Sequence, residues 1–506
     1  MLEKGDHRSM SSEGESASSR PDIEAYRLMR AGNFAAALPW ARQAVRGASR
    51  CLPAHGMLAT ILVHLGRLEE AERTIEEALA CGPGSGDAYD ALAHASLRLA
   101  HHEQSNSLYR RAVEVEPDSA RLWYNLATSE RSLGRLGEAE AACDRAIALD
   151  PQQHRAWLLR AELRPQTGQV NHVNELQQRL AQPELDARAR VVLGYALAKE
   201  LDDLGRFDEA FGWFSTAARA RRQHLAYDVA IDEHKMERIR QEFSQIGQGD
   251  FAGGEVAGSE APSQRFIFIV GLPRSGTTLV ERILLGLKGV RSNGETENFC
   301  QALLAAASPS GHDVFARTAR ADPATVAANY RQLAAPLNHG LVIEKLPMNY
   351  LYLGAIHRAL PHARLVIVRR SPLDSCFAMY RTLFGDAYPF SYDFQDLARY
   401  YSAYETLMRH WRSTLGERMH EIVYEELVAA PAEVAAKLAQ YCDLAWSPQA
   451  LDVQNTGGVS LTASAAQIRR PIYGTSSGRW RHYRKHLQPL IDALRARGIA
   501  VPDDVM

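Results

Sequence analysis

One short segment has the residue types of an anion-binding loop: Arg274, Ser275, Gly276, Thr277 and Thr278. It follows the apolar run 266–270, whose aromatic and β-branched residues predict a strand buried on both faces of a parallel sheet. Beyond the loop, apolar residues recur at helical spacing over 279–287, so the chain is expected to run strand, tight loop, helix. Such a junction presents backbone N–H groups and the positive end of a helix dipole, which bind phosphate or sulfate oxygens.

The loop differs from the nucleoside-triphosphatase loop GxxxxGK[ST] at one position. Gly271 and Gly276 have the glycine spacing of that motif, but Thr277 stands where it has lysine. Because that lysine contacts the outer phosphates of ATP, its absence argues against a triphosphate site. An ordinary strand-to-helix turn without a ligand is the alternative that the pattern leaves open.

Three further places carry candidate polar groups. Glu295 lies 21 residues beyond Arg274, after a helix that returns the chain toward the sheet, and a carboxylate there can take a proton from a hydroxyl. Lys345 ends the next apolar run, and a lysine at the carboxyl end of a strand lies on the ligand side of an open α/β sheet. Arg369 and Arg370 follow the strand expected over 365–368 and suit a second phosphate. A solvated loop carboxylate and a surface lysine are the alternatives for Glu295 and Lys345.

The length and composition limit the number of domains and the class of protein that can position these residues. A chain of 506 residues predicts two to four domains, and its 46% hydrophobic and 23% charged residues are ordinary for a globular protein. The net charge of −2 favours no nucleic-acid partner. Six scattered cysteines without a CxxC pair predict free thiols and no structural zinc. The absence of an apolar run of about 18 residues predicts no membrane span, and together these features predict a cytoplasmic protein.

The N-terminal half contains an internal repeat. Similar sequence segments begin at five positions spaced by 34 residues: Gly32, Gly66, Ala100, Gly134 and Gly168. Small residues follow five positions after three of them, and prolines follow seventeen positions after three of them. This is the period and pattern of tetratricopeptide repeats, in which each unit is a pair of antiparallel helices. A further copy from Gly205 is offset by three and is expected to cap the array.

These patterns divide the chain into four parts. We expect a flexible tail over residues 1–21, an α-solenoid of repeats over 22–246, a linker rich in Gly, Ala, Ser and Pro over 247–263, and an α/β domain over 264–506. The array either recruits a peptide or partner protein in a concave groove or serves as a rigid spacer or dimerisation surface, so a homodimer remains open.

From about residue 265 to about 487 the chain resembles the sulfotransferases, in particular protein-tyrosine sulfotransferases and bacterial proteins that join such a domain to tetratricopeptide repeats. The resemblance implies a three-layer, P-loop-like α/β domain with a mainly parallel sheet. It implies that the anion loop holds the 5′-phosphosulfate end of 3′-phosphoadenosine 5′-phosphosulfate (PAPS), and that no metal is required. The residues that this assigns to the donor are Arg274, Ser275, Gly276, Thr277 and Thr278.

The resemblance also assigns roles at the reacting centre. Glu295 falls where the family has its base, within Asn-Gly-Glu-Thr-Glu in place of the family's Gly-Glu-Glu-Thr-Arg. Glu297 therefore replaces an arginine that helps to receive acidic peptides, which argues against acidic tyrosine motifs as acceptors. Lys345 stabilises the bridging oxygen, and Ser464 supports the sulfonate and the leaving phosphate.

The remaining family positions concern the nucleotide. Arg370 corresponds to the ligand of the 3′-phosphate, but the serine that usually follows eight residues later is Ala378 here, and Ser375 either compensates or only begins a helix. Tyr424 corresponds to a contact of the adenosine. In the last basic stretch, Arg470 and Arg479 correspond to the family's Lys-Pro and Lys-Trp lysines.

The sequence therefore predicts an enzyme that transfers a sulfonate from PAPS to an acceptor hydroxyl, on a protein recruited by the repeats or on a carbohydrate, lipid or small metabolite. Two alternatives stay open: a nucleotide-dependent kinase on a similar core, and a repeat scaffold whose C-terminal domain has lost catalysis. Ala378 is the residue that favours the scaffold.

Overall fold

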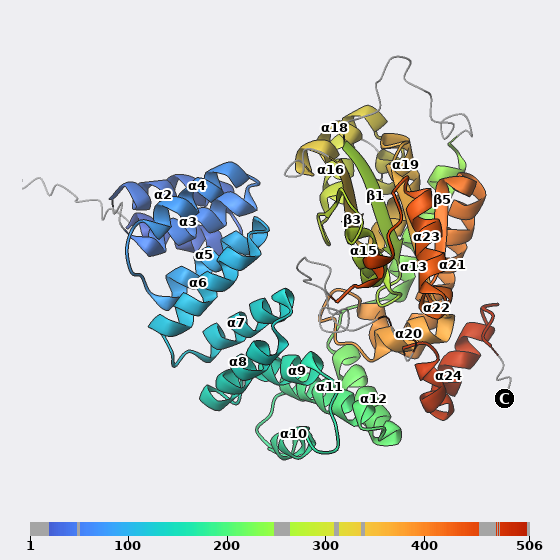
Figure 1. Cartoon of the computed structure of the whole chain (residues 1–506), viewed down its shortest axis with the longest axis horizontal. Helices are drawn as coiled ribbons and strands as arrows, with labels where there is room; N and C mark the ends of the chain where they lie inside the picture. The colour runs from blue at the N-terminus through green and yellow to red at the C-terminus, as the bar shows by residue number, and fades with distance from the viewer. Residues whose placement is uncertain are drawn as a thin grey trace, which may run out of the picture. The chain divides into compact units, whose positions relative to one another are not determined.

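The computed structural model describes residues 20–47, 51–246, 264–307, 313–334, 340–454, 472, 474 and 476–502. The chain forms two compact units, residues 1–129 and 130–506, and most of their helices and strands are labelled in Figure 1. Among the described residues, no helix combines the length and the apolar character needed to cross a membrane. None of the six cysteines forms a disulfide.

The first unit holds the beginning of the repeat array. Its helices are α1 (Pro21–Arg30), α2 (Phe34–Gly47), α3 (Leu52–His64), α4 (Leu68–Leu79), α5 (Gly86–Arg98), α6 (His102–Val115) and most of α7 (Ala120–Leu133). The chain turns between paired helices at Gly32, Gly66 and Ala100, with φ angles of 75°, 70° and 61°. The small residues Ala37 and Ala71 are fully buried, which lets the paired helices approach closely.

The second unit continues the array before the sheet begins. Its repeat helices are α8 (Leu136–Leu149), α9 (His154–Leu163), α10 (Val173–Leu180), α11 (Ala187–Asp203), α12 (Phe207–Gln223) and α13 (Val229–Ser244). Gly134 and Gly205 turn with positive φ as the other repeat positions do, but Gly168 does not. Gly168 instead lies in the longer connection 164–172 between α9 and α10. Asp203 holds this connection, because its carboxylate accepts a hydrogen bond from the Gln166 N–H at 2.8 Å.

The sheet of this unit has five strands, all paired in parallel, in the order β2-β3-β1-β4-β5. They are β1 (Gln264–Gly271), β2 (Val290–Ser292), β3 (Gly340–Lys345), β4 (Arg364–Arg369) and β5 (Met419–Val423). The central strand β1 pairs with β3 on one side and β4 on the other, so the strand order reverses beside it. In open α/β sheets this reversal creates a crevice at the carboxyl ends of the strands, where ligands bind.

Helices cover both faces of the sheet and complete the expected three layers. The α-helices are α15 (Thr277–Leu285), α16 (Asn298–Ala306), α17 (Val314–Ala319), α18 (Pro323–Leu333), α19 (Leu353–Ala359), α20 (Pro372–Tyr380), α21 (Phe394–Leu415), α22 (Tyr424–Ala429), α23 (Pro431–Tyr441) and α24 (Arg484–Arg495). Short 3₁₀ turns are η1 (Pro347–Tyr352), η2 (Pro389–Tyr392), η3 (Gly416–Arg418), η4 (Pro448–Leu451) and η6 (Arg479–Tyr483). The fold predicted from the sequence, an α-solenoid followed by a parallel three-layer α/β domain, is confirmed.

Alternation along the strands decides which helices cover which face. Ile267 and Ile269 of β1 join an aliphatic cluster with α15, α22 and α23. Phe268 points the other way and contacts Phe299 of α16 and Tyr330 of α18, with ring centroids 5.7 and 5.6 Å apart. Because neighbouring strand residues face opposite layers, the last two residues of β3, Glu344 and Lys345, also enter different layers.

Candidate active site

Two glycines of the loop between β1 and α15 lie close to neighbouring elements of the fold. Gly276 has a φ of 106°, and a Cβ atom built on it would lie 2.4 Å from the Tyr424 ring. A Cβ atom on Gly271 would lie 2.4 Å from the carbonyl oxygen of Val368 on β4. Only glycine fits both positions, so the loop packs tightly against β4 and α22. The helix α15 begins at Thr277, and its first N–H groups are those that a helix leaves without an intrahelical partner.

The carboxyl end of β3 brings two predicted residues together. Lys345, whose side chain is fully buried, donates a hydrogen bond from Nζ to Glu295 Oε1. Its Nζ also lies 3.7 Å from Glu281 Oε2 on α15, and Glu281 in turn accepts a hydrogen bond from the Ser292 hydroxyl at 2.5 Å. Glu295 keeps 36% of its side chain exposed, so this carboxylate has one edge on the buried lysine and another open to an acceptor.

The neighbouring residue Glu344 holds the same loop from the opposite layer. Its carboxylate accepts hydrogen bonds from the Thr296 hydroxyl, from Asn293 Nδ2 at 3.4 Å and from the Tyr330 hydroxyl at 3.2 Å. Glu344 is fully buried, and this burial raises the pKa of its carboxyl to about 7 although all three hydrogen bonds lower it. Glu295 therefore projects from a loop fixed on both sides of β3.

Glu344→Gln is expected to stabilise the protein more at pH 8 than at pH 5, relative to the wild type. The folded carboxyl holds its proton up to about pH 7, whereas the unfolded one loses it near pH 4.5. The bound proton therefore stabilises the folded protein fully below pH 4.5. As the pH rises from 4.5 to 7, the free energy of unfolding of the wild type falls by on the order of 3 kcal/mol from this group. Glutamine is uncharged throughout. Thermal unfolding of both proteins at pH 5, 7 and 8 tests this, and a midpoint difference independent of pH would contradict it.

Arg370, just beyond β4, joins the anion loop to the last basic segment. Its Nη1 donates to the carbonyl oxygen of Arg274 at 3.0 Å, and its Nη2 donates to the carbonyl oxygen of Ser476. Its guanidinium lies 4.8 Å from the centroid of the Tyr424 ring and 3.7 Å from Asp374. Burial nevertheless lowers the pKa of Arg370 and raises that of Asp374, so their attraction does not offset the loss of water. An additional anion would stabilise the charge of this arginine.

Three buried polar atoms around the loop have no hydrogen-bond partner within the part of the chain that the structure describes: Ser275 Oγ, Arg370 Nε and Ser371 Oγ. Buried polar groups are nearly always hydrogen-bonded, so such atoms point to a ligand or ordered water. Two hydroxyls and a guanidinium N–H suit the oxygens of phosphate or sulfate groups. The residues present therefore fit a phosphate or sulfate group.

The other predicted nucleotide residues are placed as follows. Tyr424 lies between Gly276 and Arg370, as the first residue of α22. The Ser375 hydroxyl donates to the Arg370 carbonyl oxygen at 3.3 Å and so serves the start of α20. Arg479 directs its guanidinium to Asp202 of the repeat helix α11, at 2.7 Å. Ser464 and Arg470 lie outside the described residues.

Several polar residues of the site were not identified from the sequence: Glu281, Ser292, Glu344, Asp374 and Ser371. A signal for Glu281 existed, because it stands next to Arg282 among the apolar residues of a helix that covers the sheet, where charged residues are unusual. Glu344 had a similar signal in the apolar run before Lys345. Ser371 and Asp374 had none, since Ser, Pro and Asp at a helix start are explained by capping alone.

Sequence comparisons agree with this geometry. Residues 266–448 match the sequence model of the Sulfotransferase family, and residues 28–95 and 91–163 match models of the tetratricopeptide repeat. The chain is a tetratricopeptide-repeat protein with a sulfotransferase-family domain. The family match contains the anion loop, Glu295, Lys345, Arg370 and Tyr424.

Two relatives align with different fractions of this chain. An uncharacterized protein of Aquifex aeolicus is 27% identical over 340 residues, which cover 64% of this chain and 44% of that protein. A Caenorhabditis briggsae protein named "Putative protein-tyrosine sulfotransferase" is 25% identical over 232 residues, which cover 43% of this chain and 81% of that protein. The chain thus spans less than half the length of the Aquifex relative.

Solved structures resemble each half separately. The sulfotransferase domain of the Synechococcus PCC 7002 olefin synthase covers 48% of this chain, with 98% of its own length aligned, 18% identity and a TM-score of 0.35. The repeat protein YrrB covers 38% of this chain, with 89% of its own length aligned, 18% identity and a TM-score of 0.26.

Proposed function

We propose that the protein transfers a sulfonate group from PAPS to an acceptor hydroxyl. The observation that carries this proposal is the contact between Lys345 and Glu295, together with three buried polar atoms in and beside the anion loop that have no partner among the described residues. The family match supports sulfotransferase chemistry at this site.

The donor would lie across the carboxyl ends of β1 and β4. The hydroxyl of Ser275 and the first N–H groups of α15 suit the 5′-phosphosulfate, and the dipole of α15 favours its charge. Arg370 suits the 3′-phosphate because burial lowers the pKa of its guanidinium, and a phosphate dianion would stabilise the positive charge in this buried position. The donor, when bound, supplies the sulfonate and the leaving phosphate.

In the transfer step the acceptor oxygen forms a bond to sulfur on the side opposite the bridging oxygen. Glu295 takes the acceptor proton, and the bond from sulfur to the bridging oxygen breaks with its electron pair. 3′-phosphoadenosine 5′-phosphate (PAP) leaves with this pair, and Lys345 stabilises the charge that develops on the bridging oxygen. We further propose Arg274, and Ser464 outside the described residues, as donors to the sulfonate.

The acceptor is proposed to be a polypeptide, because the tetratricopeptide repeats form surfaces that commonly bind peptides. Carbohydrate, lipid and small-molecule hydroxyls are the other classes to be screened. Glu297 beside the base disfavours acidic peptides, since it would repel them at the entrance to the site.

The donor assignment is tested by calorimetric titration of PAP without added metal. The wild type is expected to bind PAP, and the Arg274→Ala, Arg370→Ala double variant to bind at least about 100-fold more weakly, because hydrogen bonds to charged groups contribute about 1.5–3 kcal/mol each. Arg291→Ala is a matched control, since this arginine lies on the edge strand β2 and is exposed.

Two results would overturn the assignment. A wild type that does not bind PAP would not be an active PAPS-dependent enzyme, and turnover of ATP with Mg²⁺ would instead favour the kinase. Equal loss of affinity in Arg291→Ala would mean that general positive charge, rather than this site, binds the nucleotide.

A further inference from the structure

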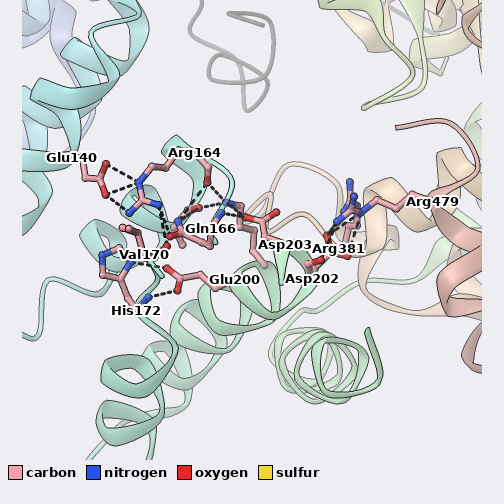
Figure 2. Close-up of polar contacts among 12 residues, drawn as sticks. Glu140, Arg164, Gln166, Val170, His172, Glu200, Asp202, Asp203, Arg381 and Arg479 are labelled. Atoms are coloured by element: carbon pink, nitrogen blue, oxygen red, sulfur yellow. Dashed lines mark hydrogen bonds and ion pairs between the residues drawn. The ribbon is translucent and has the colours of Figure 1, made fainter. Parts of the chain in front are cut away.

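The repeat helix α11 sends two adjacent carboxylates in different directions. Asp203 turns toward the connection 164–172 of the array, where it accepts hydrogen bonds from the Gln166 N–H and pairs with Lys199 at 2.7 Å. Asp202 turns toward the α/β domain and meets two arginines (Figure 2). The helix α11 and the α/β domain lie in the same compact unit. One helix of the array therefore also contacts the sulfotransferase-family domain.

Asp202 binds three side chains of the α/β domain. It accepts from Arg381 Nη1 at 2.7 Å, from Arg479 Nε and Nη2 at 3.2 and 2.7 Å, and from the Tyr483 hydroxyl. Only 3% of its side chain is exposed. Burial by itself would raise the pKa of this carboxyl, but Arg381 and Arg479 lower it below its usual value. Asp202 is therefore the charged centre of a buried cluster.

The cluster continues into the proposed nucleotide site. Ser476 accepts a hydrogen bond from Arg370, and the Gly478 N–H donates to Asp374 at 2.8 Å, so one end of segment 476–479 is fixed there. The other end is Arg479, which Asp202 holds. Arg381 lies close enough to Arg370 to lower the pKa of that guanidinium further.

The charges of this cluster explain why a carboxylate from the array is needed. Arg370, Arg381 and Arg479 carry three positive charges, against which stand Asp202 and Asp374 and, beside Arg370, Glu425. Without Asp202, two partly buried arginines would repel each other and would turn toward solvent. With it, the Nε and Nη2 edge of Arg479 is fixed, and Nη1 makes no hydrogen bond to the described residues. A binding site requires such fixed supporting residues.

We propose that Asp202 is a positioning residue of the nucleotide site, through which the repeat array orders segment 476–479 and Arg479 for the 3′-phosphate of the donor. This inference rests on the proposed function. It adds to that function a second role for the array, which would support the donor site whether or not it also recruits acceptors. The charge of Arg274 in the anion loop also acts on the array, because it counteracts the burial that raises the pKa of Glu162 on α9.

The test compares PAP with adenosine 5′-monophosphate, which lacks only the 3′-phosphate. In calorimetric titrations, Asp202→Asn is expected to weaken PAP at least about tenfold and to change adenosine 5′-monophosphate less than about threefold, as measured by competition where its binding is weak. Asp203→Asn, on the same helix but facing the array, is expected to leave the PAP affinity unchanged. So is Asp208→Asn, which removes a different contact of the array, with Lys485.

A second variant separates positioning from stability. Asp202→Asn combined with Arg381→Met removes one positive charge along with the negative one, so thermal stability is expected to recover while the PAP affinity stays low. Recovery of affinity together with stability would overturn the proposal, as would equal weakening of both nucleotides in Asp202→Asn.

Failure of the proposed function gives a different result. If the wild type binds no PAP, hydrogen exchange at the Gly478 and Arg479 amides of the nucleotide-free protein still reports on the segment. Asp202→Asn should speed this exchange at least about tenfold and Asp203→Asn should not. Unchanged exchange in Asp202→Asn would show that Asp202 does not order the segment.

Discussion

Lys345→Met is expected to lower sulfonate transfer by about 10³-fold while PAP affinity changes less than about tenfold. The Lys345 ammonium is fully buried and contacts Glu295, so it lies where the reacting group must be placed. Its charge is most useful when the bond from sulfur to the bridging oxygen breaks, because negative charge appears there only in the transition state. The rate is measured as release of PAP from PAPS, with the best acceptor from a screen or with water as acceptor.

A control for Lys345→Met must account for Glu281 and Glu295, the two carboxylates that lose their ion-pair partner. Removing Lys345 leaves Glu281 and Glu295 together, and breaking such a buried pair costs about 3–5 kcal/mol of stability. Adding Glu281→Gln removes the repulsion, so the double variant should regain stability without regaining activity. Restored activity in the double variant would assign Lys345 a structural role only.

Glu295→Gln is expected to lower transfer by about 10²–10⁴-fold, the range that positioned general bases contribute. The amide keeps the hydrogen bond with Lys345 but cannot accept the acceptor proton. PAP affinity is expected to remain within about threefold of the wild type, because the binding residues on β1 and β4 are untouched. The same PAP-release assay gives the rate, and calorimetry gives the affinity.

Glu297→Gln is the matched control, because this second exposed carboxylate stands two residues further along the same loop. Transfer within about threefold of the wild type is expected there. If both variants lose activity equally, the loop as a whole and not a base at Glu295 would limit the rate. An unchanged rate in Glu295→Gln would remove the base from the mechanism.

The fold was predictable because its signals are local. A repeat of 34 residues fixes paired helices, and five positive-φ turns fall at repeat positions or at the offset copy. The buried run 266–270 followed by a glycine loop and an apolar helix specifies a parallel strand and its crossover. The exception was Gly168, where a longer connection between α9 and α10 replaced the expected turn.

The candidate site was only partly predictable. The sequence placed Lys345 and Arg370 at the carboxyl ends of strands and Glu295 after a helix that returns toward the sheet. The structure brings Lys345 and Glu295 into contact. Glu344 stood out as a charge in an apolar run, but its role could not be predicted, because its partner Thr296 lies 48 residues earlier in the chain. Partners far apart in the chain leave no periodic trace in either segment.

The sequence by itself determined the two architectures and indicated the anion-binding loop, since helical period, strand pattern and loop composition act over a few residues. Only the tertiary structure decided what Arg479 contacts. A lone arginine before a tryptophan suits a phosphate as well as a carboxylate, and the choice depends on which group the fold brings to it. Here that group is Asp202, 277 residues earlier in the chain, on a helix of the repeats.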